Sequence, residues 1–266
     1  MNHEVLIIDS IRTHNIQYTI GGRKILSQQA DFVINRHDLV CISGPSGGGK
    51  TTLLNLLCGL CKPDQGDIYW GDHQIHPPGN GINIDQLRMD WISMVFQEPR
   101  LAKQLSGWEN IYLPLKIAGR FDTLDKPLLA QLLRVFFLDQ APEHHFGASA
   151  SAATGAAASA DPAEAIEHHP LFATIDDKLR RPVATFSSGQ MQRIAIIRAI
   201  MTLPRYILAD EILNSVEPEL QDNTWQVIKH ICRQRQIGFV LVTHNQALLN
   251  DPDFSQTFRI ADGAFA

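Results

Sequence analysis

The amino-acid sequence predicts an α/β protein in which a helical region interrupts a parallel sheet. Short, almost fully apolar runs such as YILAD (206–210) and GFVLVTH (238–244) are typical of strands buried on both faces of such a sheet. Segments with apolar residues at helical spacing alternate with these runs. Between about 98 and 186 the pattern is helical, which predicts an insertion of helices into the α/β unit.

The start of the chain is predicted to be rich in β-strands. In residues 3–42, short apolar runs alternate with turn signals at Gly21–Gly22 and Asn35–Arg36, and we expect a strand to end at Ser43. The segment WISMVFQ (91–97) is a further predicted strand because it is rich in β-branched and aromatic residues.

The helices are predicted from leucines and isoleucines that recur every three or four residues. In one of them, Leu128, Leu129, Leu132 and Leu133 have this spacing. The helical segments are 52–60, much of 107–138, 189–203 and about 217–234. After the last predicted strand, a weakly patterned tail runs to Ala266.

Composition excludes several classes of protein. The chain has 266 residues, of which 44% are hydrophobic, so it is not disordered or fibrous. The formal net charge of −5 supplies no basic field for a polyanion, which argues against nucleic acid as a partner. No apolar run is long enough to span a bilayer, and the first residues lack a signal-peptide pattern, so we expect a cytosolic chain.

The four cysteines do not form the framework of a disulfide-rich protein. Cys58 and Cys61 have CxxC spacing, but no second pair of cysteines or histidines accompanies them. A zinc or redox site is one interpretation, and buried small residues at a helix end are the favoured one.

The segment GPSGGGKT (44–51) matches the phosphate-binding pattern G-x-x-x-x-G-K-[ST] at every fixed position. Glycines let backbone N–H groups turn toward a phosphate, and the following helix directs its N-terminus at the same charge. Lys50 adds a positive charge, and the Thr51 hydroxyl is a ligand for Mg²⁺. The alternative is a glycine-rich turn without a ligand. The candidate nucleotide-binding residues are Gly44, Pro45, Ser46, Gly47, Gly48, Gly49, Lys50, Thr51 and Thr52.

Two acids, Asp210 and Glu211, lie at the end of the predicted strand 206–210. They should lie at the carboxyl edge of the sheet, where ligands of open α/β sheets bind. We expect Asp210 to hold Mg²⁺ and Glu211 to orient, or accept a proton from, a water that attacks the γ-phosphate. Acids at this position also serve as helix N-caps, which is the competing interpretation.

The stretch FSSGQMQRIAIIRA (186–199), just upstream of the two acids, resembles the LSGGQ signature of ATP-binding-cassette (ABC) ATPases. The resemblance covers nearly the whole chain. It implies a P-loop NTPase with a RecA-like parallel sheet, an N-terminal antiparallel β subdomain and an inserted α-helical subdomain. The chain would be a single ABC domain over 1–266. Its nucleotide-binding core would span about 1–97 and 187–266, and its helical subdomain about 98–186.

The resemblance to ABC ATPases implies roles for further residues. Gln97 is similar to the Q-loop glutamine that senses Mg²⁺ and the γ-phosphate, and His244 to the switch histidine. Tyr18 lies where the family stacks an aromatic ring on adenine. Taken singly, these residues could be a solvated glutamine, a loop histidine and an ordinary strand aromatic. Ser187, Gly189 and Gln190 would contact ATP held by the opposite subunit, although this run could also be a plain N-cap.

Two segments, 109–119 and 208–219, resemble the branch that contains the lipoprotein-release, macrolide-export and cell-division ATPases. The resemblance implies an ATP-hydrolysing transporter subunit that uses ATP and Mg²⁺ and forms a head-to-tail homodimer or heterodimer. An integral membrane permease on a separate chain would dock near Glu98–Leu105 and Trp108–Asn110, holding the subunit at the inner face of the membrane. The alternatives are a soluble non-transport ABC ATPase and a weakly hydrolysing regulatory subunit.

Three departures from the family pattern concern the catalytic region. Ser188 replaces a signature glycine, Ile212-Leu213 replaces the usual Pro-Thr after the acids, and Glu217 stands in place of the D-loop aspartate. In addition, an alanine-rich segment at about 140–174 separates the helical region from the signature. We interpret this segment as a solvated surface insertion rather than as a metal site built from its histidines.

Overall fold

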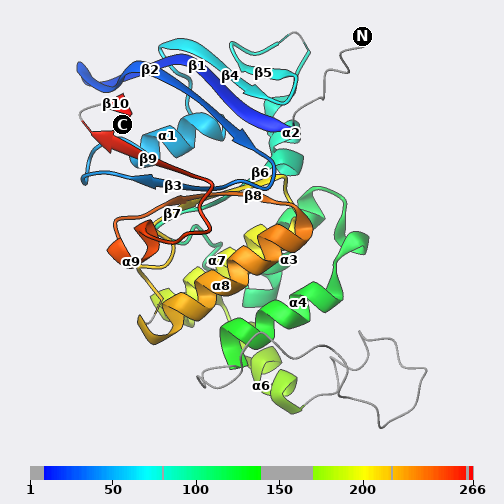
Figure 1. The fold of residues 1–266 in the computed structure, drawn as a ribbon. Coiled ribbons are helices and arrows are strands. Elements are labelled where there is room, and N and C mark those ends of the chain that lie inside the picture. Colours follow the sequence, from blue (N-terminus) through cyan, green and yellow to red (C-terminus); the bar gives the residue numbers. More distant parts are fainter. Residues whose placement is uncertain (1–8, 80, 139–169, 217, 262–263, 266) are drawn as a thin grey trace, which may run out of the picture. The chain divides into compact units, whose positions relative to one another are not determined.

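A computed structural model describes residues 9–79, 81–138, 170–216, 218–261 and 264–265, and these residues form two compact units (Figure 1). The first unit contains the described residues up to Glu98, then Thr202–Asn214, and the described residues from Ile228 onward. The second contains those of Pro99–Met201 and Ser215–Val227. Helix α8 (Pro218–Arg235) contributes residues to both units.

The first unit begins with a four-stranded antiparallel sheet, in the order β2-β1-β4-β5. Strand β1 (Ser10–Ile20) pairs with β2 (Arg23–Asn35) through the turn predicted at Gly21–Gly22, where both glycines have positive φ. Strands β4 (Gln65–Trp70) and β5 (His73–His76) complete the sheet. One face of β1 carries the buried residues Ile11, Thr13 and Ile16, so this sheet covers a core on one side.

The second sheet of this unit has six strands in the order β10-β9-β3-β8-β7-β6. Strands β3 (Leu39–Ser43), β8 (Gly238–Val242), β7 (Tyr206–Asp210) and β6 (Ile92–Val95) are parallel, as predicted. Strand β9 (Gln256–Ala261) runs parallel to β3, and the short β10 (Ala264–Phe265) is antiparallel to β9. Every residue of β7 and β8 is buried, which explains their continuous apolar sequences.

Helix α1 (Lys50–Leu57) lies between the two sheets (Figure 1). Its leucines Leu53, Leu54, Leu56 and Leu57 join residues of both sheets in one hydrophobic core. Two further helices, α2 (Ile84–Trp91) and α9 (Gln246–Leu249), lie directly before β6 and after β8. Because α1 begins directly after the β3 strand and its loop, the core fixes the position of the predicted phosphate-binding segment.

The second unit is helical. It contains α3 (Gly107–Ile117), α4 (Lys126–Leu133) with a π-turn at Arg134–Leu138, α6 (Pro170–Leu179) and α7 (Ser188–Met201), with 3₁₀ turns at Phe121–Thr123 and Val183–Thr185. Ser106 and Glu109 form a capping box at the start of α3. Helix α7 packs against α3 and α4, and its residues are buried on nearly all sides. Its packing places α7 in this helical unit, whereas the sequence grouped 187–266 with the core.

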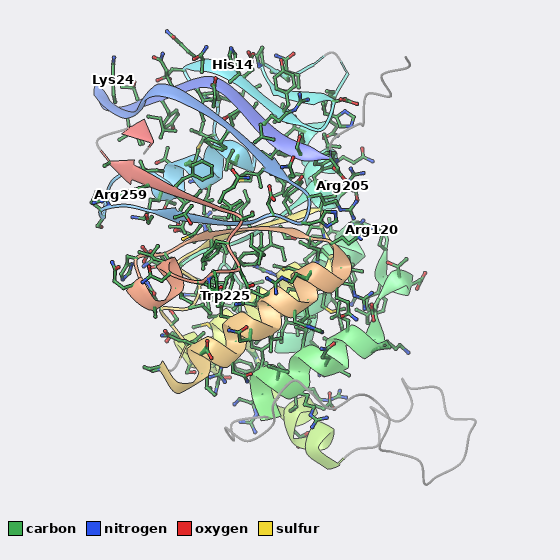
Figure 2. All side chains as sticks on the ribbon, in the orientation of Figure 1. His14, Lys24, Arg120, Arg205, Trp225 and Arg259 are labelled. Atoms are coloured by element: carbon green, nitrogen blue, oxygen red, sulfur yellow. The ribbon has the colours of Figure 1, made fainter. Side chains whose placement is uncertain are left out.

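An aromatic stack closes the core of the first unit. Trp70 and Trp91 stack with ring centroids 6.4 Å apart, and Trp91 stacks on Tyr206 at 6.2 Å. Arg205, labelled in Figure 2, places its guanidinium 4.3 Å from the Trp91 ring centroid. Trp70 is fully buried, and its Nε1 donates a hydrogen bond to the Leu57 carbonyl at the end of α1, at 2.9 Å. This bond links α1 to the antiparallel sheet.

Among the described residues, no helix has the length and apolar character that a membrane span requires.

Replacing Trp70 with phenylalanine should lower the free energy of unfolding by about 1–3 kcal/mol, because the buried Leu57 carbonyl loses its donor. Urea unfolding followed by circular dichroism measures this change. Tyr69→Phe is the matched control in the same strand, and it should change stability by less than about 0.5 kcal/mol. Equal midpoints for Trp70→Phe and the parent chain would contradict the structural role of this hydrogen bond.

Candidate active site

The loop between β3 and α1 has a backbone that only glycine adopts easily. Gly44, Gly47 and Gly49 have φ values of 147°, 73° and 99°. A Cβ atom on Gly44 would lie 2.2 Å from the Ile260 carbonyl oxygen of β9, and one on Gly48 would lie 2.9 Å from the Pro45 carbonyl oxygen. The loop therefore combines left-handed backbone with close main-chain approach, as the phosphate-binding pattern predicts.

Lys50 is the first residue of α1, and its side chain is buried under the loop. Its Nζ donates hydrogen bonds to the carbonyl oxygens of Gly44 and Pro45, each at 2.9 Å. Because the N-cap residue is Gly49, no side chain caps the N-terminus of α1. The ammonium group and the first N–H groups of the helix thus form one electropositive site, suited to an anion.

Thr51 and Asp210 meet at the carboxyl edge of the parallel sheet. The Thr51 hydroxyl donates a hydrogen bond of 2.6 Å to Oδ2 of Asp210, the last residue of β7. Burial raises the pKa of Asp210, and the nearby Glu211 carboxylate raises it further, while Thr51 and Lys50 oppose the shift. A hydroxyl and a carboxylate oxygen at this distance match the oxygen ligands that Mg²⁺ prefers.

Glu211 lies directly after β7, with a left-handed φ of 51°. Its backbone N–H donates to the Val242 carbonyl of β8, which extends the sheet by one residue. His244 Nδ1 lies 3.1 Å from Oε1 of Glu211, and Gln97 Nε2 donates to Oε2 at 3.3 Å. The structure thus brings together three residues that the sequence placed far apart, Gln97, Glu211 and His244.

A fourth residue, Asn214, contacts the same carboxylate and was not predicted from the sequence. Its Nδ2 donates a hydrogen bond of 2.9 Å to Oε2 of Glu211. The sequence signal was weak, because an asparagine three residues after an acid contacts it only if the backbone turns sharply between them.

Tyr18 lies in β1, which is separated from the phosphate-binding loop by strand β2. It pairs with Leu26 of β2, and the neighbouring Ile25 reaches the loop, since its Cγ2 would lie 2.6 Å from a Cβ on Gly49. The Tyr18 hydroxyl lies beside the Cys61 thiol, whose negative form raises the pKa of Tyr18, and burial adds to the shift. The ring is half-buried at the edge of the core.

The predicted signature residues lie in the second unit, at the start of α7. The Ser187 hydroxyl accepts a hydrogen bond from the Gln190 N–H, and the Gln190 side chain accepts one from the Ser187 N–H, each at 3.2 Å. This reciprocal pair of hydrogen bonds caps the N-terminus of α7, as the alternative N-cap interpretation of this run expected. Ser187 and Ser188 are exposed, while Gly189 is buried.

Two features singled out in the sequence are not placed by the structure. Glu217, at the predicted D-loop position, lies outside the described residues, as do residues 139–169 of the alanine-rich segment predicted at about 140–174. The described end of that segment belongs to α6.

The cysteine pair lies at the end of α1. Cys58 is buried and Cys61 is half-buried, and both are free thiols. Burial raises the pKa of Cys58 to about 11, and its Sγ donates to the Asn55 carbonyl at 3.4 Å. In the described part of the chain, no group of three or more His, Cys, Asp or Glu side chains is arranged to hold a metal ion.

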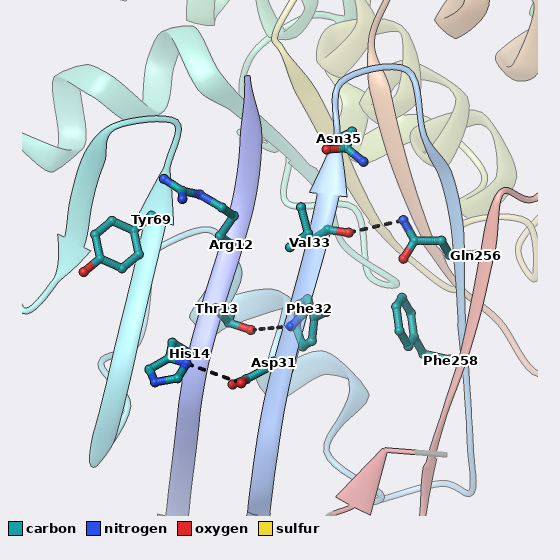
Figure 3. A pocket seen from close by; sticks show the side chains of 10 residues that line it. All are labelled: Arg12, Thr13, His14, Asp31, Phe32, Val33, Asn35, Tyr69, Gln256 and Phe258. Atoms are coloured by element: carbon teal, nitrogen blue, oxygen red, sulfur yellow. Dashed lines mark hydrogen bonds and ion pairs between the residues drawn. The ribbon is translucent and has the colours of Figure 1, made fainter. Parts of the chain in front are cut away.

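A separate hollow of about 670 Å³ lies where the exposed side of the antiparallel sheet approaches β9 (Figure 3). The guanidinium of Arg12 lies over the Tyr69 ring and donates to the Gly71 carbonyl at 2.7 Å. His14 pairs with Asp31 at 3.3 Å (Figure 3). The charged groups of this hollow are thus engaged with one another or with the backbone.

A phosphate-binding loop, a buried lysine, a Thr–Asp pair and a glutamate at one edge of a parallel sheet define a P-loop nucleoside triphosphatase. The family model described as ABC transporter matches residues 27–214. The chain belongs to the ABC transporter family, and it is an ATP-binding, ATP-hydrolysing subunit of that family.

Relatives with a known name support the predicted branch. The lipoprotein-releasing system ATP-binding protein LolD of Idiomarina loihiensis is 28% identical over 87% of this chain and 85% of its own. The ABC transporter ATP-binding protein YtrE of Bacillus subtilis is 28% identical over 86% of this chain and 84% of its own.

Solved structures confirm the predicted fold class. The dimeric bacterial ABC transporter cassette MJ0796 matches with a TM-score of 0.71 at 23% identity, covering 95% of both chains. A dimer of MJ0796 in a post-hydrolysis state with ADP and Pi matches with a TM-score of 0.70 at 22% identity, over 96% of this chain and 97% of that one.

Gly44→Ala should lower the affinity for ATP by at least about tenfold, because the added Cβ forces the loop away from the Ile260 carbonyl. Gly119→Ala is the control: Gly119 also has a positive φ, of 65°, but no atom lies within 4 Å of the new Cβ. Titration with a fluorescent ATP analogue measures both variants. Equal affinities for the two would show that the close approach at Gly44 does not shape the binding loop.

Proposed function

We propose that this chain hydrolyses Mg²⁺-bound ATP at the loop of residues 44–51 and transmits the resulting conformational change to a separate membrane permease. The observation that carries the proposal is the set of contacts around Glu211. One carboxylate, next to the Thr51–Asp210 pair, is contacted by Gln97 and His244 from two distant segments of the chain and by a residue of its own turn, Asn214. Such convergence on one acid at a sheet edge is typical of a catalytic centre.

Lys50 and the N–H groups of the loop would bind the β- and γ-phosphates. Thr51, Asp210 and Gln97 would hold Mg²⁺, which supplies positive charge to the phosphate oxygens when it is bound. The existing hydrogen bond between Thr51 and Asp210 already places two of these oxygen ligands side by side. Tyr18 would stack on the adenine from the last part of strand β1.

Glu211 would orient the attacking water and accept its proton. His244, at 3.1 Å from Oε1, is close enough to orient this carboxylate and to reach toward the γ-phosphate. The His244 side chain is 63% exposed and that of Glu211 is 15% exposed, so the histidine faces solvent while the acid is held inside the edge of the sheet. Gln97 would contact the bound nucleotide and so link the nucleotide to the segment of the chain that follows Gln97.

We further propose a head-to-tail dimer, either of two copies or with a related chain. Ser187, Gly189 and Gln190 would contact the ATP bound by the partner subunit. The exposure of Ser187 supports this assignment, and so do the dimeric MJ0796 cassettes that share the fold. ATP would favour the closed dimer and hydrolysis the open one, which is a ligand-driven population shift.

The permease would dock on the segment Glu98–Leu105 with Trp108 and Glu109, placing the subunit at the inner face of the membrane. The names of the lipoprotein-releasing relatives support a transport role. Asn110, predicted to line the same surface, is instead fully buried. Its side chain accepts from the Ala102 N–H at 2.8 Å and donates to the Ala102 carbonyl at 3.1 Å, so it would shape the docking segment from inside.

Glu211→Gln should reduce ATP turnover by at least about a hundredfold, because the amide cannot accept the proton of the attacking water. The affinity for ATP should remain within about twofold of the parent, since the phosphate contacts are unchanged. Phosphate release and equilibrium nucleotide binding measure the two quantities. Asp222→Asn, an exposed carboxyl-to-amide change on α8, is the matched control. Normal phosphate release from Glu211→Gln would refute the assigned role.

A further inference from the structure

Asn214 lies one turn beyond Glu211, and we infer that it is a positioning residue that holds the Glu211 carboxylate in its reactive orientation. The inference rests on the proposed function, since it assumes that Glu211 is the residue that activates water. It assigns a role to a side chain that no motif predicted.

The backbone between Glu211 and Asn214 forms a tight turn. Glu211 has a left-handed φ of 51°, and the Asn214 N–H donates to the Glu211 carbonyl at 3.2 Å. The two residues inside the turn, Ile212 and Leu213, are 1% and 2% exposed. Their burial anchors the turn in the protein interior. The Ile212-Leu213 pair, which replaces the usual Pro-Thr, therefore has a structural purpose in this chain.

The turn directs the Asn214 side chain back onto the acid. Its Nδ2 is 2.9 Å from Oε2 of Glu211, whereas the Gln97 amide reaches the same oxygen at the longer distance of 3.3 Å. Asn214 is thus the closer of the two amide donors. A hydrogen bond to an ionised acceptor is stronger than one between neutral groups. This contact therefore supplies much of the restraint on the carboxylate.

The two oxygens of the carboxylate consequently have different surroundings. Oε2 accepts from the amides of Asn214 and Gln97, and Oε1 faces His244. The amide donors of Asn214 and Gln97 occupy both lone pairs of Oε2, so Oε1 is the oxygen left to receive the proton of the water. Without Asn214, the carboxylate could rotate about its last side-chain bond, and the geometry for water attack would be lost in part of the molecules.

The test compares three variants of the full chain, Asn214→Ala, Asn214→Asp and Asn214→Gln. Because Asn214 is exposed, none of them opens a cavity. Asn250→Ala is the matched control, since Asn250 is an exposed asparagine at the end of α9 whose amide donates only locally, to the Gln246 carbonyl at 3.1 Å. The measurements are kcat and KM for ATP hydrolysis, the affinity for a fluorescent ATP analogue, and Tm.

Asn214→Ala should lower kcat by about tenfold with KM and nucleotide affinity within about twofold of the parent, which is the signature of a lost orientation rather than lost binding. Asn214→Asp should lower kcat further, because it sets a second carboxylate against Glu211. Asn214→Gln retains an amide donor and should recover kcat to within about threefold of the parent. Tm should stay within about 1 °C in all of them.

Two outcomes would overturn the inference, and they differ from failure of the proposed function. If Glu211→Gln abolishes turnover while Asn214→Ala and Asn214→Asp keep parental kcat, the catalytic assignment stands and the positioning role is wrong. If Asn214→Ala lowers Tm and nucleotide affinity together with kcat, Asn214 is merely structural. Normal turnover by Glu211→Gln would refute the proposed function, and the positioning role would be refuted with it.

Discussion

The parallel register of three adjacent strands determines where the phosphate-binding loop, Glu211 and His244 of the candidate site lie. Ile42 of β3 is level with Val242 of β8, and Val242 is level with Asp210 of β7. The strands therefore end at the same edge of the sheet. The residues that follow them, the loop from Gly44, the acid Glu211 and the histidine His244, emerge side by side although the chain separates them widely. A shift of one strand by one residue would turn its side chains to the opposite face.

This arrangement gathers charge and backbone strain in a small region. Lys50 and Asp210 are both buried, which is costly for each alone. Their placement at one edge lets opposite charges and the Thr51 hydroxyl compensate part of that cost. Glu211 adds a left-handed backbone that a residue with a side chain adopts at the expense of stability. The surrounding buried strands, and the Ile212-Leu213 anchor, offset this strain.

Sequence patterns predicted the loop and the parallel strands because each has a local cause, whereas Gln97 and His244 were assigned from the resemblance to ABC ATPases. The glycines of the loop are required by left-handed backbone, and the apolar runs 206–210 and 238–242 by burial on both faces. The sequence did not predict strand β9 because β9 lacks the continuous apolar run of a strand buried on both faces. Within Gln256–Ala261 only Ile260 is buried. Asn214 was missed because its contact depends on the left-handed turn at Glu211, and nothing in a glutamate side chain signals that backbone. The grouping of residues 187–266 with the core came from the resemblance to ABC ATPases, whereas α7 packs against α3 and α4, which are distant in sequence.

The most direct test of this arrangement is an experimental structure of the Glu211→Gln variant with ATP and Mg²⁺. The phosphates should lie in the loop of residues 44–51, with Lys50 against the β- and γ-phosphates. Mg²⁺ should be bound by the Thr51 hydroxyl, with Asp210 as a direct ligand or through a water. The amide that replaces Glu211 should face the γ-phosphate beside His244. Nucleotide bound at another place, or a γ-phosphate directed away from residue 211, would contradict the assignment of this sheet edge as the catalytic site.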